Sequence, residues 1–400
     1  MDIWEYWDTH SRIFINEDRL SSLEYVPLRL PHRDNQLNRL AEIFRPVIKK
    51  PGKVSQKVVF IGRIGTGKTV TAKFFGKKLE KYLHRKGILF KYIHINCHKD
   101  RSLYPISQKI ALEIGLKIPL RGYSYYDIFH LIFRTLSNEN IFILVTLDEI
   151  DYLSKRKGEN NIYFLSRIND EFLEEDLSRI NFIFISRNPS FFEKLENSIK
   201  SYLMHNKIDF PPYTSTEIID ILQERIIVEK AMRKKAVSDE ILELIGDLTG
   251  YEKGGPGDAR LAIEILWKAG IRAERKGRSF IEIEDVREVY STISPIRIED
   301  IKNLDRHEKM ILIATINALK NSKTRYVSTR EVIERYNILC ESYNLKPRKR
   351  TKIWEYIKIL EKMGILNTKI SSKGIRGKTT HISIDKISLE RLKKNLEYNN

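Results

Sequence analysis

The chain has 400 residues, of which 42% are hydrophobic and 31% are charged. This length exceeds one compact core, so the composition indicates a soluble globular protein with two or three domains. The formal net charge of +18 favours a polyanionic partner, most often nucleic acid.

Membrane-spanning, secreted and disulfide-stapled proteins are excluded by the same sequence. No apolar stretch approaches the ~20 residues that a helix needs to span a bilayer, so no membrane association is expected. The first residues, MDIWEYWDTHSRIF, carry an acid at position 2 and lack an apolar run, so no secretory signal is predicted. Cys97 and Cys340 lie far apart and build neither a disulfide framework nor a zinc site. We expect a reducing, cytoplasmic location.

A phosphate-binding loop is predicted in VVFIGRIGTGKTVTAKF, which joins a β-branched run to a helical stretch through a glycine-rich turn. Backbone N–H groups around Gly65, Thr66 and Gly67 are expected to face phosphate oxygens, and glycine permits the close approach. In the pattern Gly-x-x-x-x-Gly-Lys-Thr, Lys68 reaches the β- and γ-phosphates and the Thr69 hydroxyl ligates Mg²⁺. The loop therefore predicts binding of ATP or ADP with Mg²⁺.

An acidic pair follows a later strand in the segment NIFILVTLDEIDYL. Its apolar run predicts a strand that is buried on both faces of a parallel sheet. At the end of this strand, Asp148 can hold the metal through water, and Glu149 can orient the attacking water. Such a pair can also cap a helix, but together with the loop it predicts a phosphate-hydrolysing site.

The surrounding segments alternate between strands and helices. FKYIHINCH predicts a strand, LYPISQKIALEIGL and SYYDIFHLIFRTLSN predict helices, and RINFIFISRN predicts a further strand. This alternation is typical of a doubly wound parallel sheet. At the tip of the last strand, Arg187 and Asn188 are the candidates to contact a γ-phosphate.

A helical bundle is predicted after the sheet, beginning at FPPYTSTEIIDILQERI. Pro211 and Pro212 end the sheet layer, and a helix capped near Thr214–Thr216 follows. The expected helices cover residues 215–232, 238–249, 257–276 and 284–292. A small helical bundle behind a phosphate-binding sheet predicts a lid.

Arg260 lies in the first turn of the third lid helix, after the glycine-rich GGPGDAR. A cation at a helix N-terminus is electrostatically disfavoured, so Arg260 calls for an anion in front of it. The alternative is a surface arginine paired with Asp258, which can also cap this helix, or with Glu264.

The last hundred residues carry much of the positive charge, with 23 lysine and arginine residues against 10 aspartate and glutamate residues. Three predicted helices, DRHEKMILIATINALKN, VSTREVIERYNILCESYN and RKRTKIWEYIKILEKMGI, precede a strand–turn–strand segment. This order predicts a winged helix, which binds DNA or, alternatively, docks a protein partner. The concentrated charge favours DNA.

The third of these helices is amphipathic, and its apolar residues are expected to pack inward: Ile353, Tyr356, Ile357, Leu360 and Met363. Its N-terminal end is basic and is expected to enter the major groove. The predicted wing can reach phosphates or an adjacent minor groove. The DNA-binding candidates are Lys346, Arg348, Lys349, Arg350 and Lys352 at the helix and Lys373, Arg376 and Lys378 in the wing.

Together these motifs resemble the archaeal origin-recognition initiators, which are related to the eukaryotic origin recognition complex and its cell-division-control partner. The resemblance begins at FINEDRLSSLEYVPLRLPHRDNQLNRLAEIFRPVI and continues through GRIGTGKT, LDEIDYL, FPPYTSTEIIDILQERI and GGPGDARLAIEIL. It implies an α/β AAA+ P-loop domain with a doubly wound parallel sheet, a helical lid and a C-terminal winged helix. The implied boundaries are 1–211, with an N-terminal lead-in over 1–35, then 212–296 and 297–400.

The resemblance also implies roles for individual residues. Asp148 and Glu149 match the Walker B pair, Arg260 matches sensor 2, and LRLPHRDNQ matches the adenine side of the pocket. The implied nucleotide-binding residues are Gly65, Thr66, Gly67, Lys68, Thr69, Tyr213, Arg225 and Arg260. The implied catalytic residues are Lys68, Asp148, Glu149 and Arg260, with Thr69 and Asp148 as metal ligands.

Two departures from the family pattern are visible. The family usually ends its fourth strand in Ile-Ser-Asn, whereas this chain reads Ile185-Ser186-Arg187-Asn188, so the sensor 1 residue is Arg187 or Asn188. The segment that normally carries an arginine finger reads ENSIKSYL, in which only Lys200 is basic. Lysine is a poorer bidentate partner for phosphate than arginine. We therefore expect slow hydrolysis, with ATP used as a switch.

The implied function is an ATP-switched initiator that binds double-stranded DNA at replication origins and helps bring in the replicative helicase. Paralogous initiators are expected partners, and the protein is expected to be associated with the nucleoid. A small helical element within 99–127 is a further candidate for DNA contact. One alternative is a paralogue that acts as a DNA-binding regulator or replication repressor. A second alternative is a protein-remodelling AAA+ ATPase.

Overall fold

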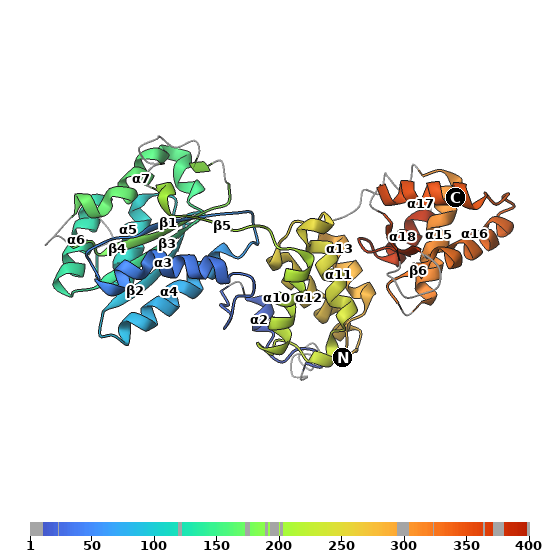
Figure 1. The fold of residues 1–400 in the computed structure, drawn as a ribbon, viewed down its shortest axis with the longest axis horizontal. Coiled ribbons are helices and arrows are strands. Elements are labelled where there is room, and N and C mark those ends of the chain that lie inside the picture. The colour runs from blue at the N-terminus through green and yellow to red at the C-terminus, as the bar shows by residue number, and fades with distance from the viewer. Residues whose placement is uncertain are drawn as a thin grey trace. The chain divides into compact units, whose positions relative to one another are not determined.

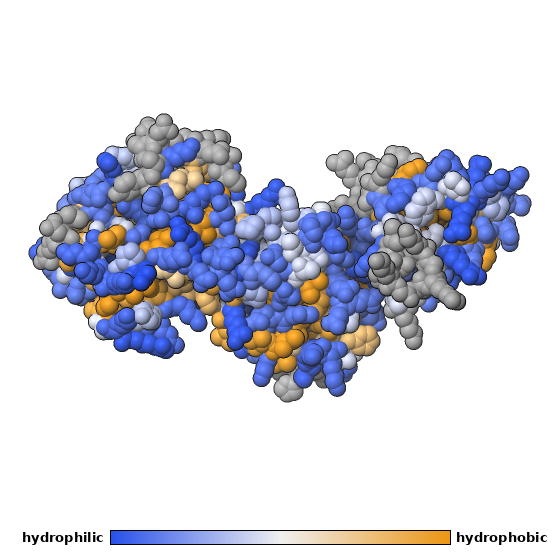
Figure 2. Space-filling model, in the orientation of Figure 1, coloured by the Kyte–Doolittle hydropathy of each residue, from blue (hydrophilic) through white to orange (hydrophobic). Residues whose placement is uncertain are grey.

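The computed structural model describes residues 11–22, 24–118, 122–172, 177–188, 191–192, 200, 203–293, 304–322, 324–362, 365–370 and 380–397. The chain divides into two compact units. One unit contains residues 24–213 and 256–259, and the other contains the rest of the described chain. None of the helices in the described ranges combines the length and apolar character that a bilayer-spanning helix requires. Figure 2 shows a drawn face that is mostly polar, with apolar residues in scattered patches.

The first unit is built on a five-stranded parallel sheet (Figure 1). Its strand order is β2-β3-β4-β1-β5. The strands are β1 (Lys57–Ile61), β2 (Phe90–Asn96), β3 (Phe142–Asp148), β4 (Ile180–Ser186) and β5 (Lys207–Asp209). The predicted doubly wound sheet is therefore confirmed. β5 was not predicted, because three residues are too few for a recognisable strand pattern.

Helices cover both faces of this sheet. On one face lie α3 (Asp34–Lys49) and α4 (Lys68–His84), and on the other lie α5 (Leu103–Glu113), α6 (Tyr125–Asn138) and α7 (Asp151–Glu171). Side chains of β1, β2, β3 and β4 alternate between the two apolar layers. In β1, Val58 and Phe60 join the layer of α3 and α4, whereas Val59 and Ile61 join the other layer.

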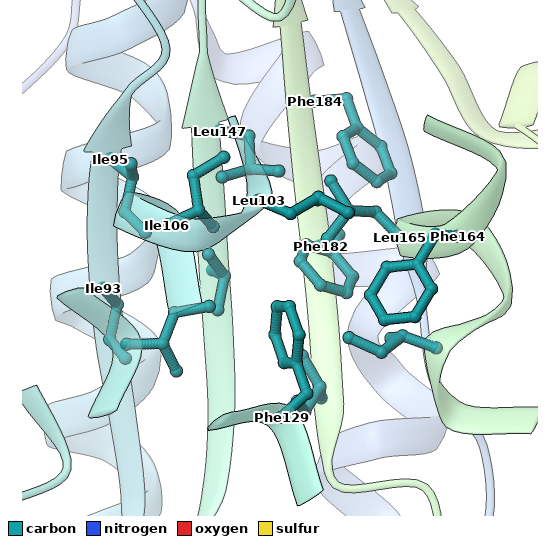
Figure 3. Close-up of a cluster of buried hydrophobic side chains, with 14 of the residues drawn as sticks. Ile93, Ile95, Leu103, Ile106, Phe129, Leu147, Phe164, Leu165, Phe182 and Phe184 are labelled. Atoms are coloured by element: carbon teal, nitrogen blue, oxygen red, sulfur yellow. The ribbon is translucent and has the colours of Figure 1, made fainter. Parts of the chain in front are cut away.

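The second apolar layer is shown in Figure 3. Strand and helix side chains interdigitate there, with Phe182 and Phe184 of β4 stacked on each other at 5.3 Å between ring centroids. All seven residues of β3 and of β4 are buried. Burial on both faces keeps the ends of these strands in fixed positions. The polar residues that directly follow the strands are therefore held in fixed positions as well.

The second unit contains the lid helices α10 (Ser215–Ile227), α11 (Asp239–Thr249), α12 (Ala259–Arg275) and α13 (Ile283–Ile293). They match the four predicted lid helices: α10, α11 and α12 are shorter than predicted, and α13 is one residue longer at each end. Thr214 and Glu217 form a capping box at the start of α10, in which each side chain accepts the other's backbone N–H. This reciprocal pairing fixes where the first lid helix begins.

The N-terminal segment, including α2 (Asp18–Ser21), packs on the lid helices. Phe14 is buried and pairs with Met232 through a backbone bridge. A Cβ atom at Gly270 of α12 would lie 2.6 Å from the Phe14 ring, so glycine permits this close approach. The indole of Trp267 donates a 2.7 Å hydrogen bond to Glu17. The segment is therefore attached to the lid over its described length.

The winged helix lies in the same unit. It contains α15 (Arg306–Asn321), α16 (Thr329–Ser342), α17 (Arg350–Lys362) and α18 (Leu389–Glu397). Strands β6 (Val327–Ser328), β8 (Thr380–Ser383) and β7 (Asn367–Ile370) pair in that order as an antiparallel sheet. The predicted inward residues of α17 are buried: Ile353, Tyr356, Ile357 and Leu360. Met363 lies outside the described residues. α18 was not predicted, although its Leu392 and Leu396 are buried.

A buried ion pair joins the winged helix to α11 within this unit. Arg325 is 2% exposed and donates through Nε and Nη2 to Asp385 at 3.1 and 2.9 Å. Its Nη1 donates to Asp247 of α11 at 3.0 Å. Burial alone would raise the pKa of Asp385, but the hydrogen bonds and charge of Arg325 hold it below the usual carboxyl value.

We predict that Arg325→Met lowers the free energy of unfolding by about 3–5 kcal/mol, because the Asp385 carboxylate stays buried without its cation. The loss should be largest above pH ~4, the usual carboxyl pKa, and should shrink as the pH falls through the lower folded-state pKa of Asp385. Denaturant unfolding at several pH values measures both effects. Arg330→Met, which changes an exposed arginine, is the matched control. Equal stability of the two variants would contradict the prediction.

Candidate functional site

The glycine-rich loop connects β1 to α4 and has a backbone that favours glycine at two positions. Gly65 and Gly67 have φ angles of 72° and 86°, in the left-handed region. A Cβ atom at Gly67 would lie 2.6 Å from the hydroxyl oxygen of Tyr213. Lys68 is the first residue of α4, so the loop ends at a helix N-terminus. A glycine-rich loop that ends at a helix N-terminus can form an anion-binding concavity of backbone N–H groups.

Lys68 and Thr69 have internal partners. The Lys68 side chain is buried, and its Nζ donates to the carbonyl oxygens of Gly62 and Arg63 at 2.7 and 2.6 Å. Thr69 Oγ1 donates to Asp148 Oδ2 at 2.6 Å. A phosphate contact would require Lys68 to exchange carbonyl oxygens for phosphate oxygens, which its three rotatable donors allow.

Asp148 and Thr69 together offer the oxygen ligands that Mg²⁺ prefers. Asp148 is the last residue of β3 and is 5% exposed. Within the described ranges, no group of three or more His, Cys, Asp and Glu side chains is arranged to hold a metal ion. The Thr69 hydroxyl and the Asp148 carboxylate fit a Mg²⁺ ion that completes its shell with water and phosphate oxygens, as this ion commonly does.

His94 lies beside this carboxylate and was not predicted. It projects from β2, and its Nε2 is 3.7 Å from Asp148 Oδ2. Burial lowers the pKa of His94 to about 4, against the attraction of Asp148. The imidazole is therefore neutral at pH 7 and does not act as a cation beside Asp148.

Glu149 and Arg187 form an ion pair next to the loop. Glu149 follows β3 with a φ angle of 59°, and Arg187 follows β4. The backbone N–H of Arg187 donates to Asp151 at 3.1 Å. Of the two sensor 1 candidates, Arg187 is therefore held against the acidic pair, whereas Asn188 is exposed.

Arg33 supports the loop through hydrogen bonds to its backbone, and this role was not predicted from the sequence. It is 2% exposed, and its Nε and Nη2 donate to the Thr66 carbonyl at 3.1 and 2.9 Å. Its guanidinium also lies 3.7 Å from the centroid of the Tyr213 ring. The only sequence signal was its place in LRLPHRDNQ, which the resemblance assigns to the adenine side of the pocket.

Asp258 was expected as a helix cap, but it also lies against the loop. A Cβ atom at Gly65 would fall 1.7 Å from Asp258 Oδ1, and the backbone N–H of Ala259 donates to the Gly65 carbonyl at 3.2 Å. Residues 256–259 therefore belong to the unit that holds the loop. Nothing in the local pattern predicted this contact.

Two further candidates for nucleotide binding belong to the second unit. Arg225 is half-buried in the last turn of α10, and Arg260 is exposed in the first turn of α12, both within the second unit. Lys200 is half-buried, whereas residues 193–199 and 201–202 of the expected finger segment lie outside the described residues.

The basic end of α17 is exposed on the winged helix. Arg348 and Lys349 precede the helix, which begins at Arg350, and its first turn contains no acidic residue. Arg348 Nε donates to His307 Nε2 at 3.2 Å, and Lys352 pairs with Glu355 at 2.6 Å. The exposed cations of this cluster are Lys346, Arg348, Lys349, Arg350 and Lys352. The wing candidates Lys373, Arg376 and Lys378 lie outside the described residues.

Comparisons with known protein families agree with this architecture. Residues 54–195 match an AAA domain, residues 219–291 match the Cdc6 AAA+ ATPase-type lid domain, and residues 299–393 match the Cdc6 C-terminal winged helix domain. The chain is 42% identical to the ORC1-type DNA replication protein 2 of Sulfurisphaera tokodaii, covering 90% of this chain and 87% of that protein. It is 32% identical to the ORC1-type DNA replication protein of Thermococcus kodakarensis, covering 96% and 91%.

Solved structures agree as well. The crystal structure of Cdc6p from Pyrobaculum aerophilum superposes with a TM-score of 0.83 at 30% identity, covering 97% of this chain and 98% of that one. The ORC1 protein of Aeropyrum pernix, solved in complex with DNA, gives a TM-score of 0.63 at 30% identity, covering 98% of each chain. The chain therefore belongs to the archaeal Orc1/Cdc6 family of DNA replication initiators.

Proposed function

We propose that this initiator binds ATP with Mg²⁺ as a switch and binds double-stranded DNA at replication origins. The observation that carries the nucleotide part is the 2.6 Å contact between Thr69 of the glycine-rich loop and Asp148 at the end of β3. The ORC2 protein of Aeropyrum pernix, 27% identical with a TM-score of 0.65, was solved as ADPNP–ADP complexes, which supports this assignment. Recruitment of the replicative helicase and cooperation with paralogous initiators complete the proposed role.

The proposed nucleotide site divides its tasks among few residues. The N–H groups of residues 65–67 and the Lys68 ammonium bind phosphate oxygens. Thr69 and Asp148 hold the metal, which when bound neutralises charge on the phosphates. Glu149 orients the attacking water. The proposed lid contributions come from Arg225 and Arg260, and Tyr213 lines the site beside Arg33.

Slow hydrolysis is part of the proposal. Lys200 is the only basic residue in ENSIKSYL, the segment that in the family normally carries an arginine finger. A lysine ammonium stabilises transferred phosphoryl charge less well than a guanidinium fork. Arg187 stands where the family carries a neutral asparagine. Both departures favour a long-lived ATP state, which suits a switch more than a motor.

The proposed DNA-binding surface is the N-terminal end of α17. Several exposed cations meet there at a helix N-terminus, where positive charge is electrostatically unfavourable without an anion. DNA phosphates would supply that anion, and the exposed end would enter the major groove. The wing residues Lys373, Arg376 and Lys378 extend this surface in the proposal. The exposed rings of Tyr123, Tyr125 and Tyr126 make the element within 99–127 a second proposed contact.

We propose three functional parts: an ATPase base over 1–211, a lid over 212–296 and the winged helix over 297–400. The matched family domains, 54–195, 219–291 and 299–393, fall within these ranges. Residues 11–22 modify this division, because they pack on the lid helices.

The two alternative functions are not favoured by the comparisons, because the relatives named above are replication proteins. Mapping chromosomal binding sites with and without ATP tests the proposed role. Enrichment at replication origins would support it. Equal occupancy of origins and bulk DNA, or occupancy confined to promoters, would point to a regulator and contradict the proposal.

We predict that Lys68→Ala lowers affinity for ATP by about two orders of magnitude, because two charge-assisted phosphate contacts are lost. Glu149→Gln should not weaken ATP binding and should slow hydrolysis about 10²–10⁴-fold. Titration with a fluorescent ATP analogue and a single-turnover hydrolysis assay measure the two effects. Lys77→Ala, an exposed lysine of the same helix, serves as control. Full ATP affinity in Lys68→Ala would contradict the assigned site.

We predict that Arg33→Met lowers ATP affinity about tenfold, because the buried Thr66 carbonyl loses its donors and the loop loses its brace. The free energy of unfolding should fall as well. The same titration and a thermal melt provide the measurements. Arg29→Met removes an exposed arginine from the same segment and should change neither quantity. Unchanged affinity in Arg33→Met would show that the loop holds its shape without Arg33.

We predict that Arg348→Glu combined with Arg350→Glu weakens duplex DNA binding about ten- to hundredfold at low salt. The salt dependence of binding should also become shallower, by about one unit of log–log slope for each lost phosphate contact. ATP affinity should stay unchanged. Fluorescence anisotropy over a salt series measures both quantities, and Lys320→Glu, at an exposed lysine in the last turn of α15, is the control. Parallel loss of DNA and ATP binding would argue against separate sites.

A further inference from the structure

Arg187 and Glu149, two residues of the proposed catalytic site, form an ion pair with each other. The Glu149 side chain is 12% exposed and that of Arg187 is 38% exposed. Asp151 accepts hydrogen bonds from the Ser186 hydroxyl at 2.6 Å and from the Arg187 N–H at 3.1 Å. The backbone that presents Arg187 is therefore fixed, and the guanidinium is the part that can move.

The pairing competes with the work proposed for Glu149. In hydrolysis, a water oxygen forms a bond to the γ-phosphorus while the bond to the β-phosphate oxygen breaks. ADP leaves with that electron pair, and a proton of the water passes towards Glu149. A carboxylate whose lone pairs accept from a guanidinium has fewer of them for water. Glu149 therefore orients water best when it is not paired with Arg187.

Arg187 also lies at the phosphate edge of the sheet. β1 and β4 are neighbouring parallel strands, and Ile61, which leads into the glycine-rich loop, is paired with Ser186. Arg187 is the next residue after Ser186. A planar guanidinium binds phosphate as readily as carboxylate, and a γ-phosphate with its oxygens carries more negative charge than one glutamate.

We propose that Glu149 and the γ-phosphate compete for the single guanidinium of Arg187. A triphosphate in the loop draws Arg187 from Glu149, and that transfer frees Glu149 to orient water. A diphosphate has no γ-phosphate and leaves the ion pair in place. Arg187 thus distinguishes ATP from ADP and links that distinction to the readiness of Glu149. The inference deepens the proposed nucleotide switch and rests on it.

A double-mutant cycle on nucleotide affinity tests the competition. The variants are Glu149→Gln, Arg187→Asn and the combination, each titrated with Mg²⁺ and either a non-hydrolysable ATP analogue or ADP. Glu149→Gln should tighten binding of the ATP analogue about tenfold, the size of one charge-assisted contact made available. Arg187→Asn should cancel this gain in the combined variant. Affinity for ADP should change less than about threefold throughout.

Two controls separate this competition from general electrostatics. Glu24→Gln neutralises a carboxylate that pairs with Lys73 in the same unit, and it should give no gain for the ATP analogue. Glu149→Gln with Arg187→Lys, which restores a cation, should keep at least part of the gain. A gain from Glu149→Gln that persists in the combination with Arg187→Asn would overturn the proposal, and so would no gain at all. Failure of the parent protein to bind the analogue, with Lys68→Ala behaving like the parent, would instead refute the nucleotide site itself.

Discussion

The nucleotide site depends on one constraint, that β1 and β3 end at the same edge of a parallel sheet. Thr69, in the helix that follows β1, donates a hydrogen bond to Asp148, the last residue of β3. In the sheet, β4 lies between β1 and β3. The ends of β3 and β4 are held in place at this edge because both strands are buried along their whole length between two helical layers. The apolar packing of the sheet therefore sets the position of the oxygens that would hold a metal.

The cations at the two proposed binding sites have different surroundings. Lys68, Arg33 and Arg187 lie at the proposed nucleotide site, and each is held by oxygens of the chain itself. A ligand there must compete with carbonyl or carboxylate groups, so binding is an exchange of partners. The cations at the start of α17 are exposed, with no acidic residue in the first turn. A polyanion would meet them by releasing counterions, without displacing a buried partner.

Motifs and periodicity predicted the parts that are local in sequence. The glycine-rich loop, the acidic pair after β3 and the inward face of α17 depend on residues within one turn or strand of each other. Contacts between distant segments were not predictable. The hydrogen bonds from Arg33 to the Thr66 carbonyl join residues far apart in the sequence. The residues Gly65 and Asp258, which approach each other closely, are still farther apart in the sequence. α18 was missed although Leu389, Leu392 and Leu396 recur at three- and four-residue spacing, which is the pattern of an amphipathic helix with a buried face.

The stretch from Pro256 to Ala259 has a geometric consequence for the lid. These residues pack with the phosphate-binding unit, while Arg260 and the rest of α12 follow directly in the other unit. Successive residues of a helix are rotated by about 100° around its axis. Adding a single residue between Ala259 and Arg260 would therefore change the rotation of Arg260 about the helix axis relative to Asp258 and Ala259. The number of residues between Asp258 and Arg260 therefore sets the rotation of Arg260 about the helix axis relative to Asp258, in addition to the identity of each residue.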